Sequence, residues 1–419
     1  MDTLEVEGKT KPIFSWCPDV EDKALEQIKR VAALPFVDHA ALMPDAHWGQ
    51  GVCIGGVIAS RDCIVPNFVG VDIGCGMCST KTSLKVSDLK ESLRDQIRHD
   101  IVSTIPTGFS HNDDKRRKLL SSKRRNDFSY ILERNRCAQT KVTPFGHDIE
   151  DSFFSQLGTL GGGNHFIEIQ YDTEENIWIM LHSGSRNIGA RTCKFFNDMA
   201  ESTVGKYYSV VPDDIPFCPV DSDLGKKYIA WMNYALMFAF YNRKQMMEDV
   251  KDILDSNFKH LNVQFDKMIN IHHNYASLER HYGAHMWVHR KGATRVDKGT
   301  IGIIPGDMGA DTPSYIVKGL GNRESLNSCS HGAGRVMGRK DFNTRNSNVE
   351  GMKKIKDAMK GVTYGKFQKH TNRKGKETGL MEVSEAPGAY KDIRTVMNNQ
   401  TDLAEIAVEL RPLISVKDQ

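Results

Sequence analysis

The feature that most restricts the fold of this chain is a series of eight short polar loops rich in glycine. In chain order they are MPDAHWGQG (43–51), VGVDIGCGMCS (69–79), GTLGGGNHFIE (158–168), LHSGSRNIG (181–189), NIHHNYA (270–276), HRKGATR (289–295), IIPGDMG (303–309) and SCSHGAGR (328–335). Glycine allows a positive φ and a close approach of the backbone to a ligand. Binding residues concentrate in loops at the ends of strands. These loops exceed what tight turns require, so we expect them to assemble one polar site.

The segments between the loops predict a mixed α/β or α+β layered fold, because helices and strands alternate irregularly. Helical spacing of apolar residues predicts a helix over 21–34, which Pro35 ends, and a long helix from about Tyr228 to Phe258. The aromatic and Met residues of the long helix are interpreted as core packing. Short apolar runs predict strands at 51–60, 166–169, 177–181 and 413–416.

Composition excludes several classes of protein. The longest nearly apolar stretch, Tyr228 to Tyr241, is shorter than the roughly 18 residues that a membrane-spanning helix needs. The first residues, MDTLEVEGKTKPIF, lack the apolar core of a secretion signal. The nine cysteines are an odd number, so a disulfide scaffold is not expected. A reducing cytoplasm is the predicted location.

Positive charge is concentrated in two stretches of the chain. Residues 111–141 contain ten Lys or Arg against four Asp or Glu, and residues 339–376 contain twelve against three. The net charge of the whole chain is only +3, so the residues outside these two stretches are net acidic. Such stretches indicate either a polyanionic partner or two solvated insertions. Their aromatic residues could stack on bases or attach the stretches to the core; these are Phe128, Tyr130, Tyr364 and Phe367.

Five loop residues form a candidate metal site: Asp72 and Cys75 in one loop, and His165, His182 and His273 in three others. One thiolate, one carboxylate and several imidazoles suit Mn, Fe, Co or Zn. The wide spacing is unlike that of a structural zinc module. The alternative is a set of hydrogen-bonded core histidines. Cys75 and Cys78 also match C-x-x-C, but no thioredoxin-like unit surrounds them, so Cys78 is interpreted as a small buried residue.

The loop that contains His331 suggests phosphate chemistry. The chain has no G-x-x-x-x-G-K-[ST] motif, so P-loop hydrolysis of a nucleotide is not supported. The string HGAGR places His331 in a glycine-rich turn, with Arg335 four residues later. An imidazole can attack phosphorus and form a phosphoramidate, and an arginine can hold phosphate oxygens. From these residues alone, a phosphate-binding loop and a nucleophile remain equally open.

Taken together, the motifs resemble those of the RtcB family of RNA ligases. The matching strings are MPDAH, VGVDIGCGM, GTLGGGNHFIE, HSGSR, HN (273–274), RKGATR, PG-x-MG, GLGN, SHGAGR and EAPGAYKDI. They follow the family order from about residue 11 to residue 417. The resemblance implies one α+β catalytic domain over residues 1–419, in which mixed sheets flanked by helices surround a metal and nucleotide pocket. The basic stretches at about 111–141 and 339–376 would be insertions that bind the RNA backbone.

The resemblance also implies the reaction. The family uses GTP and two Mn²⁺ ions to join an RNA 3′-phosphate or 2′,3′-cyclic phosphate to a 5′-hydroxyl, through a histidine–GMP intermediate and an RNA–ppG end. Expected roles are RNA repair or tRNA splicing, with repair preferred. RNA and GTP would be the partners, without a membrane. Some members use an archease-like activator, and a monomer is expected.

Residue roles follow from the matched motifs. Cys75 would bridge the metals, with His165 and His182 completing one site and Asp72 and His273 the other. His331 would be the nucleophile. Asn164 and Asn274 would contact the GMP phosphate and sugar, and Arg335 would hold phosphate. The expected guanine pocket is Glu168, Ser314, Tyr390 and Lys417. Asp45 and His47 would lie in a supporting shell or on the RNA side.

The sequence departs from the family pattern in the nucleotide pocket. Asp307 stands where Ser is usual, and the segment 309–315 is about two residues longer than usual. Three alternative functions therefore stay open. They are capping of a 3′-phosphate end with GMP, a metal-dependent phosphodiesterase without guanylylation, and a noncatalytic RNA-binding protein.

Overall fold

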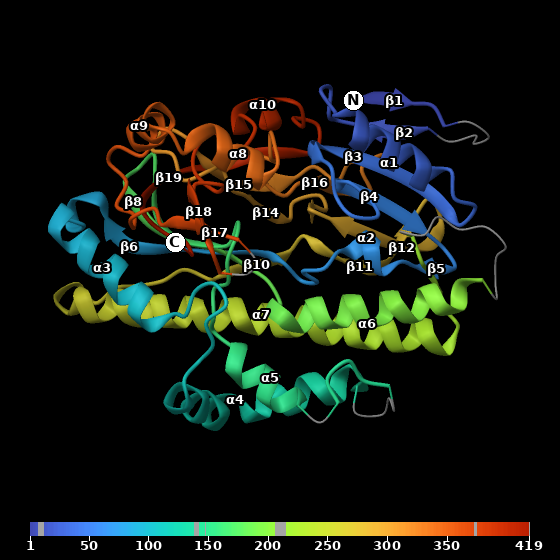
Figure 1. Cartoon of the computed structure of the whole chain (residues 1–419), viewed down its shortest axis with the longest axis horizontal. Coiled ribbons are helices and arrows are strands. Elements are labelled where there is room, and N and C mark those ends of the chain that lie inside the picture. The colour runs from blue at the N-terminus through green and yellow to red at the C-terminus, as the bar shows by residue number, and fades with distance from the viewer. Residues whose placement is uncertain (7–11, 138–141, 147, 206–214, 373–374, 419) are drawn as a thin grey trace.

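Two β-sheets form the centre of the molecule (Figure 1). The computed structural model describes residues 1–6, 12–137, 142–146, 148–205, 215–372 and 375–418. The six-stranded sheet contains, in spatial order, β1 (Asp2–Leu4), β2 (Ile13–Ser15), β3 (Val37–His47), β4 (Ile54–Ser60), β12 (Ala284–Lys291) and β11 (Asn274–His281). The seven-stranded sheet contains β10 (Ile269–His272), β6 (Gly76–Lys85), β8 (Asn176–Ser183), β7 (Phe166–Asp172), β19 (Ala404–Val416), β15 (Ser314–Gly319) and β14 (Ile301–Ile304).

Short strand pairs complete the described sheets. They are β13 (Ala293–Arg295) with β16 (Ser328–Ser330), β17 (Lys369–Thr371) with β18 (Glu377–Met381), and β5 (Cys63–Ile64) with β9 (Cys218–Pro219). The described α-helices are α1 (Asp22–Ala32), α2 (Pro66–Val69), α3 (Glu91–Thr104), α4 (Asp114–Arg134), α5 (Ile149–Gln156), α6 (Arg186–Val204), α7 (Asp223–Asn257), α8 (Arg339–Asn346), α9 (Val349–Ala358) and α10 (Ile393–Asn398). Single 3₁₀ turns lie at Val86–Asp88 and Lys259–Leu261. None of the helices in these described ranges is long and apolar enough to cross a membrane.

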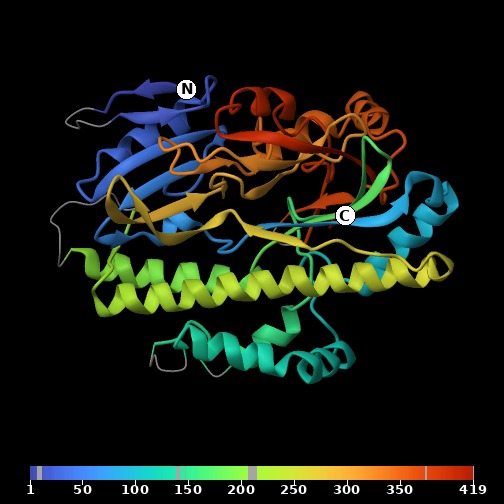
Figure 2. The ribbon, with the colours of Figure 1, turned by 180° about the vertical axis from the view of Figure 1, so that it is seen from behind.

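The helices form layers on one side of the sheets. Helices α6 and α7 run alongside each other beneath both sheets, and α4 and α5 lie beyond them (Figures 1 and 2). One apolar core fills the space between these helices, and a second lies between α7, α3 and the seven-stranded sheet. This α+β arrangement confirms the predicted fold class. The aromatic and Met residues of α7 pack into these two cores, as predicted.

Most elements predicted from periodicity are present, with shifted ends. Helix α1 matches the prediction for 21–34, and α7 matches the long helix. The predicted strand at 51–60 begins only at Ile54, because Gly51 has a positive φ and belongs to the preceding turn. The strand predicted at 413–416 is the end of β19, which begins at Ala404. The first part of β19 was not predicted, because a proline is disfavoured within a regular strand. The ladder shifts register beside Pro412.

The first basic stretch is a helix that is bound to the body of the protein. Leu120, Phe128 and Ile131 of α4 are buried in the core that α4 shares with α5 and α7. Four of its arginines form ion pairs with acidic residues of α5 and α7: Arg116–Asp249, Arg117–Asp151, Arg124–Glu248 and Arg125–Glu150. Much of the positive charge of this stretch is therefore matched within the molecule. Residues 138–141 of the stretch lie outside the described residues.

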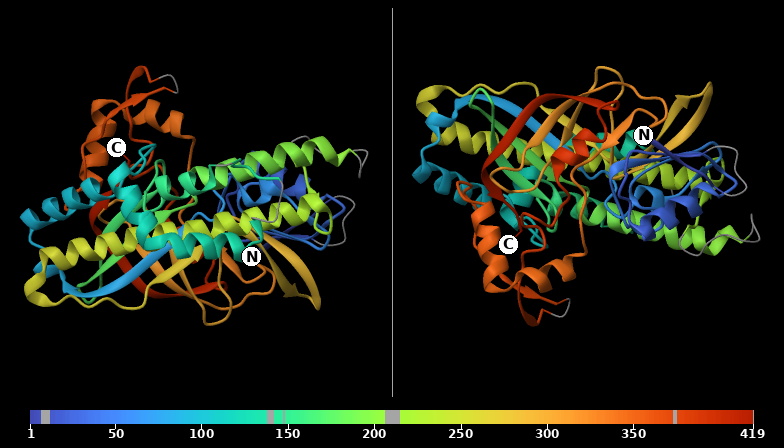
Figure 3. Two further views of the ribbon diagram at one scale, coloured as in Figure 1. Left: turned by 90° about the horizontal axis from the view of Figure 1, so that it is seen from below. Right: turned by 90° about the horizontal axis from the view of Figure 1, so that it is seen from above.

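The second basic stretch forms a small lobe with its own apolar core. Its described part comprises α8, α9 and β17, and it projects from the sheets together with β18 (Figure 3). Its core includes Met308, Phe342, Ile355, Met359 and Val383, with Tyr364 and Phe367 packed against it. We refer to residues 337–386 as the basic lobe. Residues 373 and 374 lie outside the described residues.

The attachment of α4 and α5 depends on a buried aromatic cluster, and this can be tested. Phe153 is fully buried, and its ring centroid lies 5.0–5.1 Å from those of Phe128, Phe154 and Phe238. We expect Phe153→Ala to lower the free energy of unfolding by about 3–5 kcal/mol, because it leaves a cavity. Urea denaturation followed by tryptophan fluorescence would measure the change. Leu119→Ala is the control on α4, since this side chain is 52% exposed; an equal loss in both variants would contradict the assignment.

Candidate metal and nucleotide site

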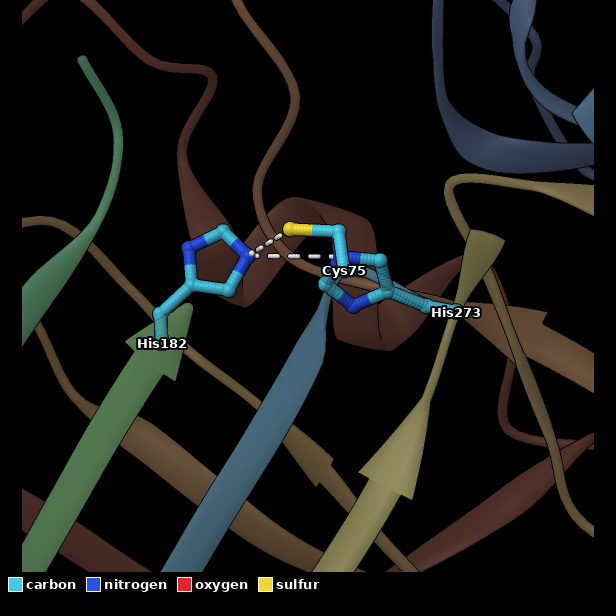
Figure 4. Close-up of side chains that lie close together, drawn as sticks. All are labelled: Cys75, His182 and His273. Carbon is cyan, nitrogen blue, oxygen red and sulfur yellow. Dashed lines mark hydrogen bonds between the residues drawn. The ribbon is translucent and has the colours of Figure 1, made fainter. Parts of the chain in front are cut away.

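The predicted metal ligands meet at one edge of the seven-stranded sheet. In the strand order β10-β6-β8-β7, Gly76 pairs with both His272 and Ser183, and His182 pairs with Phe166. Cys75, His165, His182 and His273 are at or next to these paired positions, so four neighbouring strand ends bring them together. Figure 4 shows Cys75, His182 and His273 pointing toward one another from three of these segments.

The distances between ligand atoms define two groups. Cys75 Sγ lies 3.1 Å from His182 Nε2, which lies 3.2 Å from His273 Nε2. Cys75 Sγ also lies 3.5 Å from His165 Nε2, which lies 3.1 Å from Asp72 Oδ2. Within each group the ligand atoms are all within 4.8 Å of one another, and Cys75 belongs to both. A thiolate at this position can bridge two metal ions.

The assignment of the histidines to two sites stays a prediction. The resemblance implied Cys75, His165 and His182 in one site, and Asp72 and His273 with Cys75 in the other. In the structure the ligand atoms of His182 and His273 lie close together, as do those of His165 and Asp72. Cys75 Sγ is 3.5 Å from His165 Nε2 and 3.1 Å from His182 Nε2, so it adjoins ligands of both predicted sites.

Hydrogen bonds orient two of the imidazoles for metal binding. His165 Nδ1 lies 3.0 Å from the Leu160 carbonyl, and His182 Nδ1 lies 3.1 Å from the Asn164 carbonyl. Because a carbonyl only accepts, Nδ1 carries the proton and Nε2 is left as the electron-pair donor. Both Nε2 atoms point into the cluster. This donor set fits a first-row divalent metal, and a hydrogen-bonded core histidine would not require it.

Burial sets the protonation states in the cluster. It lowers the pKa of His182 and His273 well below the usual range, so both imidazoles are neutral, the form that binds metal. Burial raises the pKa of the Cys75 thiol well above its usual range, and the Asp72 charge adds to this. Burial also opposes ionisation of Asp72, but His165 and Arg186 hold its pKa below the usual value. A cation between these groups would favour the thiolate.

Two polar residues in the middle of α7 hold all the ligand-bearing segments. The Arg243 guanidinium donates to the carbonyls of Gly74 and Ser183 at 2.7 and 2.9 Å, and to the Asn270 side chain at 2.7 Å. The Asn242 side chain accepts from the backbone N–H groups of Gly158 and Thr159, and donates to the carbonyls of Thr159 and Gly184. Both side chains are fully buried. Sequence reasoning missed this pair, although Asn242 lies at helical spacing from buried Phe238 and Met246.

The Asp72 carboxylate requires a glycine opposite it. A Cβ on Gly184 would lie 2.1 Å from Asp72 Oδ1 and 2.3 Å from Oδ2, far inside van der Waals contact. In its place, the Ser185 N–H donates to Asp72 Oδ1 at 3.0 Å. The string HSGSR therefore supplies the candidate ligand His182, a glycine that leaves room for Asp72, and the Ser185 N–H group that orients Asp72.

The predicted nucleophile faces the metal cluster and is held by a buried carboxylate. His331 Nδ1 lies 2.6 Å from Asp45 Oδ2, and the N–H groups of His331 and Gly332 donate to the same oxygen at 3.1 and 3.3 Å. Asp45 is fully buried at the end of β3. The centroids of the His331 and His273 rings are 4.8 Å apart. With its Nδ1 proton directed to Asp45, His331 presents Nε2 as the free electron pair.

A pocket opens beside His331, and most of the predicted nucleotide-binding residues line it: Asn164, Glu168, Arg335, Tyr390 and Lys417. Two predicted residues, Ser314 and Asn274, are not in its lining. Ser314 Oγ accepts from Gln170 Nε2 and from the Gly306 N–H at 3.2 and 3.1 Å. Asn274 bridges the backbone of Asp72 and Gly292. His47 is an additional lining residue.

Comparison with known proteins agrees with this geometry. A family model described as tRNA-splicing ligase RtcB matches residues 27–418. The RNA-splicing ligase RtcB of Escherichia coli strain K12 is 37% identical over 415 residues, which cover 97% of each chain. The tRNA-splicing ligase RtcB of Methanococcus maripaludis is 29% identical, covering 95% of this chain and 92% of that one. The chain belongs to the RtcB family.

Within this RtcB chain, the structure adds one group that the motifs did not reveal. The Glu385 carboxylate accepts from the Tyr390 hydroxyl and forms ion pairs with Arg335 and Arg339 at 3.3 and 2.6 Å. Burial raises the pKa of Glu385, but the charges of Lys417, Arg339 and Arg335 hold it below the usual value. Glu385 thus fixes the predicted stacking ring and the predicted phosphate clamp relative to each other. It precedes APGAY in a matched string, which was the available signal.

The close approach at Gly184 gives a test of the metal cluster. We expect Gly184→Ala to weaken binding of Mn²⁺ at least about tenfold, because the new methyl group displaces a carboxylate ligand and each lost ligand costs substantial affinity. Isothermal titration calorimetry would measure the affinity. Gly205→Ala is the matched control, because nothing lies within 4 Å of the corresponding Cβ position. Equal Mn²⁺ affinity of the unmodified protein, Gly184→Ala and Gly205→Ala would rule out Asp72 as a ligand.

Proposed function

We propose that this protein is a GTP-dependent RNA ligase that joins an RNA 3′-phosphate or 2′,3′-cyclic phosphate to a 5′-hydroxyl. The observation that carries the proposal is the hydrogen bond of His331 to the buried Asp45 carboxylate, with the His331 ring 4.8 Å from that of His273 in the cluster of candidate metal ligands. A phosphodiesterase needs the metal ligands but has no need of a nucleophilic imidazole oriented in this way. The reaction class rests on family membership, and the roles of the residues rest on their geometry.

His331 would carry GMP between the two substrates. Its Nε2 attacks the α-phosphorus of GTP, the P–N bond forms, and pyrophosphate leaves with the α–β oxygen. Asp45 Oδ2, 2.6 Å from Nδ1, stabilises the positive charge that develops on the ring. A 2′,3′-cyclic phosphate end first adds water and breaks its P–O2′ bond, which gives the 3′-phosphate and a free 2′-hydroxyl. An oxygen of the RNA 3′-phosphate then attacks the phosphorus bound to His331, which breaks the P–N bond and gives RNA–ppG. The 5′-hydroxyl finally attacks the RNA phosphate, loses its proton, and GMP leaves.

The candidate metal ligands lie beside His331, the residue that would carry GMP. We propose that Asp72, Cys75, His165, His182 and His273 would together hold two Mn²⁺ ions. Bound there, the ions would offset the charge of the phosphates and stabilise attacking and leaving oxygens. The protein residues hold the imidazoles in the neutral, Nδ1-protonated form and fix the loops through Asn242 and Arg243.

The buried end of the pocket suits a guanine base. Glu168 is buried, and its carboxylate accepts from Gln170 and Ser415. It can accept from the N1–H and amino group of guanine, while Lys417 can donate to the base oxygen. Burial lowers the pKa of Lys417, although the surrounding carboxylates of Glu385, Glu168 and Asp307 oppose this. The Tyr390 ring, with the Arg335 guanidinium 5.2 Å from its centroid, would stack on the base.

Asp307 replaces the usual Ser without leaving an unmatched charge in the pocket. Its carboxylate accepts from the N–H groups of Gly309 and Gly388 at 2.8 and 3.4 Å. Lys417 is close enough for the Asp307 charge to affect its pKa. Repulsion of the nucleotide phosphates is therefore offset by a neighbouring cation.

The covalent intermediate is the direct test of the proposal. With Mn²⁺ and α-³²P-GTP but no RNA, we expect label to remain on the denatured protein and to be absent from His331→Ala. We expect Asp45→Asn to slow labelling roughly 100-fold or more, because it removes the charge that orients and stabilises the ring. Denaturing gel electrophoresis measures both effects. Labelling of His331→Ala at the normal rate would overturn the proposal.

Glu168 predicts a pH dependence of GTP binding. Burial raises the pKa of Glu168 to about 7, with Gln170, Lys417 and Ser415 opposing the shift. Only the ionised carboxylate accepts both guanine protons, so we expect the Kd for GTP to fall about five- to tenfold from about pH 6 to pH 8. Fluorescence titration of the His331→Ala variant separates binding from chemistry.

Glu168→Gln supplies the control for this pH dependence. The variant should bind GTP about ten- to 100-fold more weakly, the range for loss of a charge-assisted hydrogen bond, and its Kd should not change over the same pH range. An unchanged pH profile in the variant would assign the titration to another group.

A further inference from the structure

A second groove continues from the nucleotide pocket toward the basic lobe. Met308, Arg339 and Lys417 line both the pocket and this groove. Beyond these shared residues, the groove is bounded by Phe109 and Gly163 on the side of the sheet, and by residues 367–371 and 382–386 of the basic lobe on the other. Whatever occupies the groove therefore reaches the pocket that contains His331.

Phe109 is the most exposed large apolar side chain of the described residues, at 100%. Its loop is nevertheless anchored to the site. The Gly108 N–H donates to the Gly161 carbonyl at 3.0 Å, and the Arg186 guanidinium donates to the Gly108 carbonyl at 2.6 Å. Gly161 begins the GGGNH segment that contains Asn164 and His165. The hydrogen bonds of Gly108 therefore attach the loop that carries the exposed Phe109 ring to the segment that contains Asn164 and His165.

The groove supplies an aromatic surface together with nearly balanced charge. Phe367 is a second, partly buried ring in its lining. The cationic lining residues are Arg339, Lys369 and Lys417, and the acidic ones are Glu382, Glu385 and Asp418. Ion pairs join Arg339 to Glu385 and Lys369 to Glu377. Such a lining suits the faces of nucleobases better than a run of phosphates, because base stacking needs rings and little net charge.

Two exposed lysines are chain neighbours of residues that line the groove. Lys340 follows Arg339, and Lys366 precedes Phe367. Both are exposed, and neither forms an ion pair with a described residue. We expect them to contact phosphates of a strand whose bases lie in the groove. On α4, by contrast, four arginines already have acidic partners.

We propose that this groove holds the last unpaired nucleotides of the RNA strand that bears the 3′-phosphate, with one base stacked on Phe109. The proposal rests on the ligase function proposed above and assigns its RNA-binding surface. Arg339, at the junction of groove and pocket, would contact the terminal phosphate as the strand enters. The base is recognised by its face, so binding at this position would tolerate any of the four bases.

The test uses single-stranded RNA with a 3′-phosphate and the full-length protein. We expect Phe109→Ala to raise the Kd for this RNA roughly five- to 100-fold, the range for loss of one base–aromatic stack. Phe109→Trp should retain affinity. Tyr130→Ala is the control, because this exposed ring lies on α4, away from the groove. Fluorescence anisotropy with labelled RNA measures the affinities.

A set of RNAs, each with one abasic nucleotide near the 3′ end, locates the stacked base. One abasic position should weaken binding to the unmodified protein and have no further effect in Phe109→Ala. Equal affinity of Phe109→Ala and the unmodified protein for this RNA would overturn the inference. It would also be overturned if the abasic position that loses its effect in Phe109→Ala were found only in the strand with the 5′-hydroxyl. RNA-independent labelling with GTP reports on the proposed function separately and should be unchanged in Phe109→Ala.

Discussion

The cluster of candidate metal ligands depends on one buried polar pair, Asn242 and Arg243, in the middle of the longest described helix. Each ligand-bearing segment leaves its strand as an irregular loop, whose backbone groups need partners once buried. Asn242 and Arg243 supply these partners for the loops on either side of β6, β7, β8 and β10. Because a helix is rigid over a few residues, two adjacent side chains fix four loops relative to one another.

The buried guanidinium has a further electrostatic consequence. Burial lowers the pKa of Arg243 to about 10, so the side chain remains charged at neutral pH. Its charge lowers the pKa of the Cys75 thiol, in opposition to burial and to Asp72. The same residue therefore holds the loop that contains Cys75 and favours the thiolate that a metal requires. An apolar residue of similar size would supply neither donors for the carbonyls nor a positive charge for the thiolate.

Local motifs predicted the members of the site better than its geometry. The five metal-ligand residues, His331 and most pocket residues lie together as their strings indicated. The distances between these side chains depend on strand order, which the sequence does not contain. Ser314 and Asn274 lie near the pocket, but hydrogen bonds to the backbone hold them outside its lining. The part of β19 from Ala404 to Pro412 was likewise not predicted, because a proline in a strand is compatible only with an irregular ladder.

Charge counting was the least specific part of the sequence interpretation, and the two basic stretches show why. Both contain an excess of Lys and Arg, yet α4 meets acidic residues of α5 and α7 that lie 25 to 133 positions away in the chain. In the basic lobe, Arg339 and Lys369 pair with Glu385 and Glu377, whereas the exposed Lys340 and Lys366 form no ion pair with a described residue. An excess of charge indicates a polyanion site only where the fold leaves cations unpaired. Lys340 and Lys366 meet that condition, and each is the chain neighbour of a residue that lines the groove leading to the nucleotide pocket.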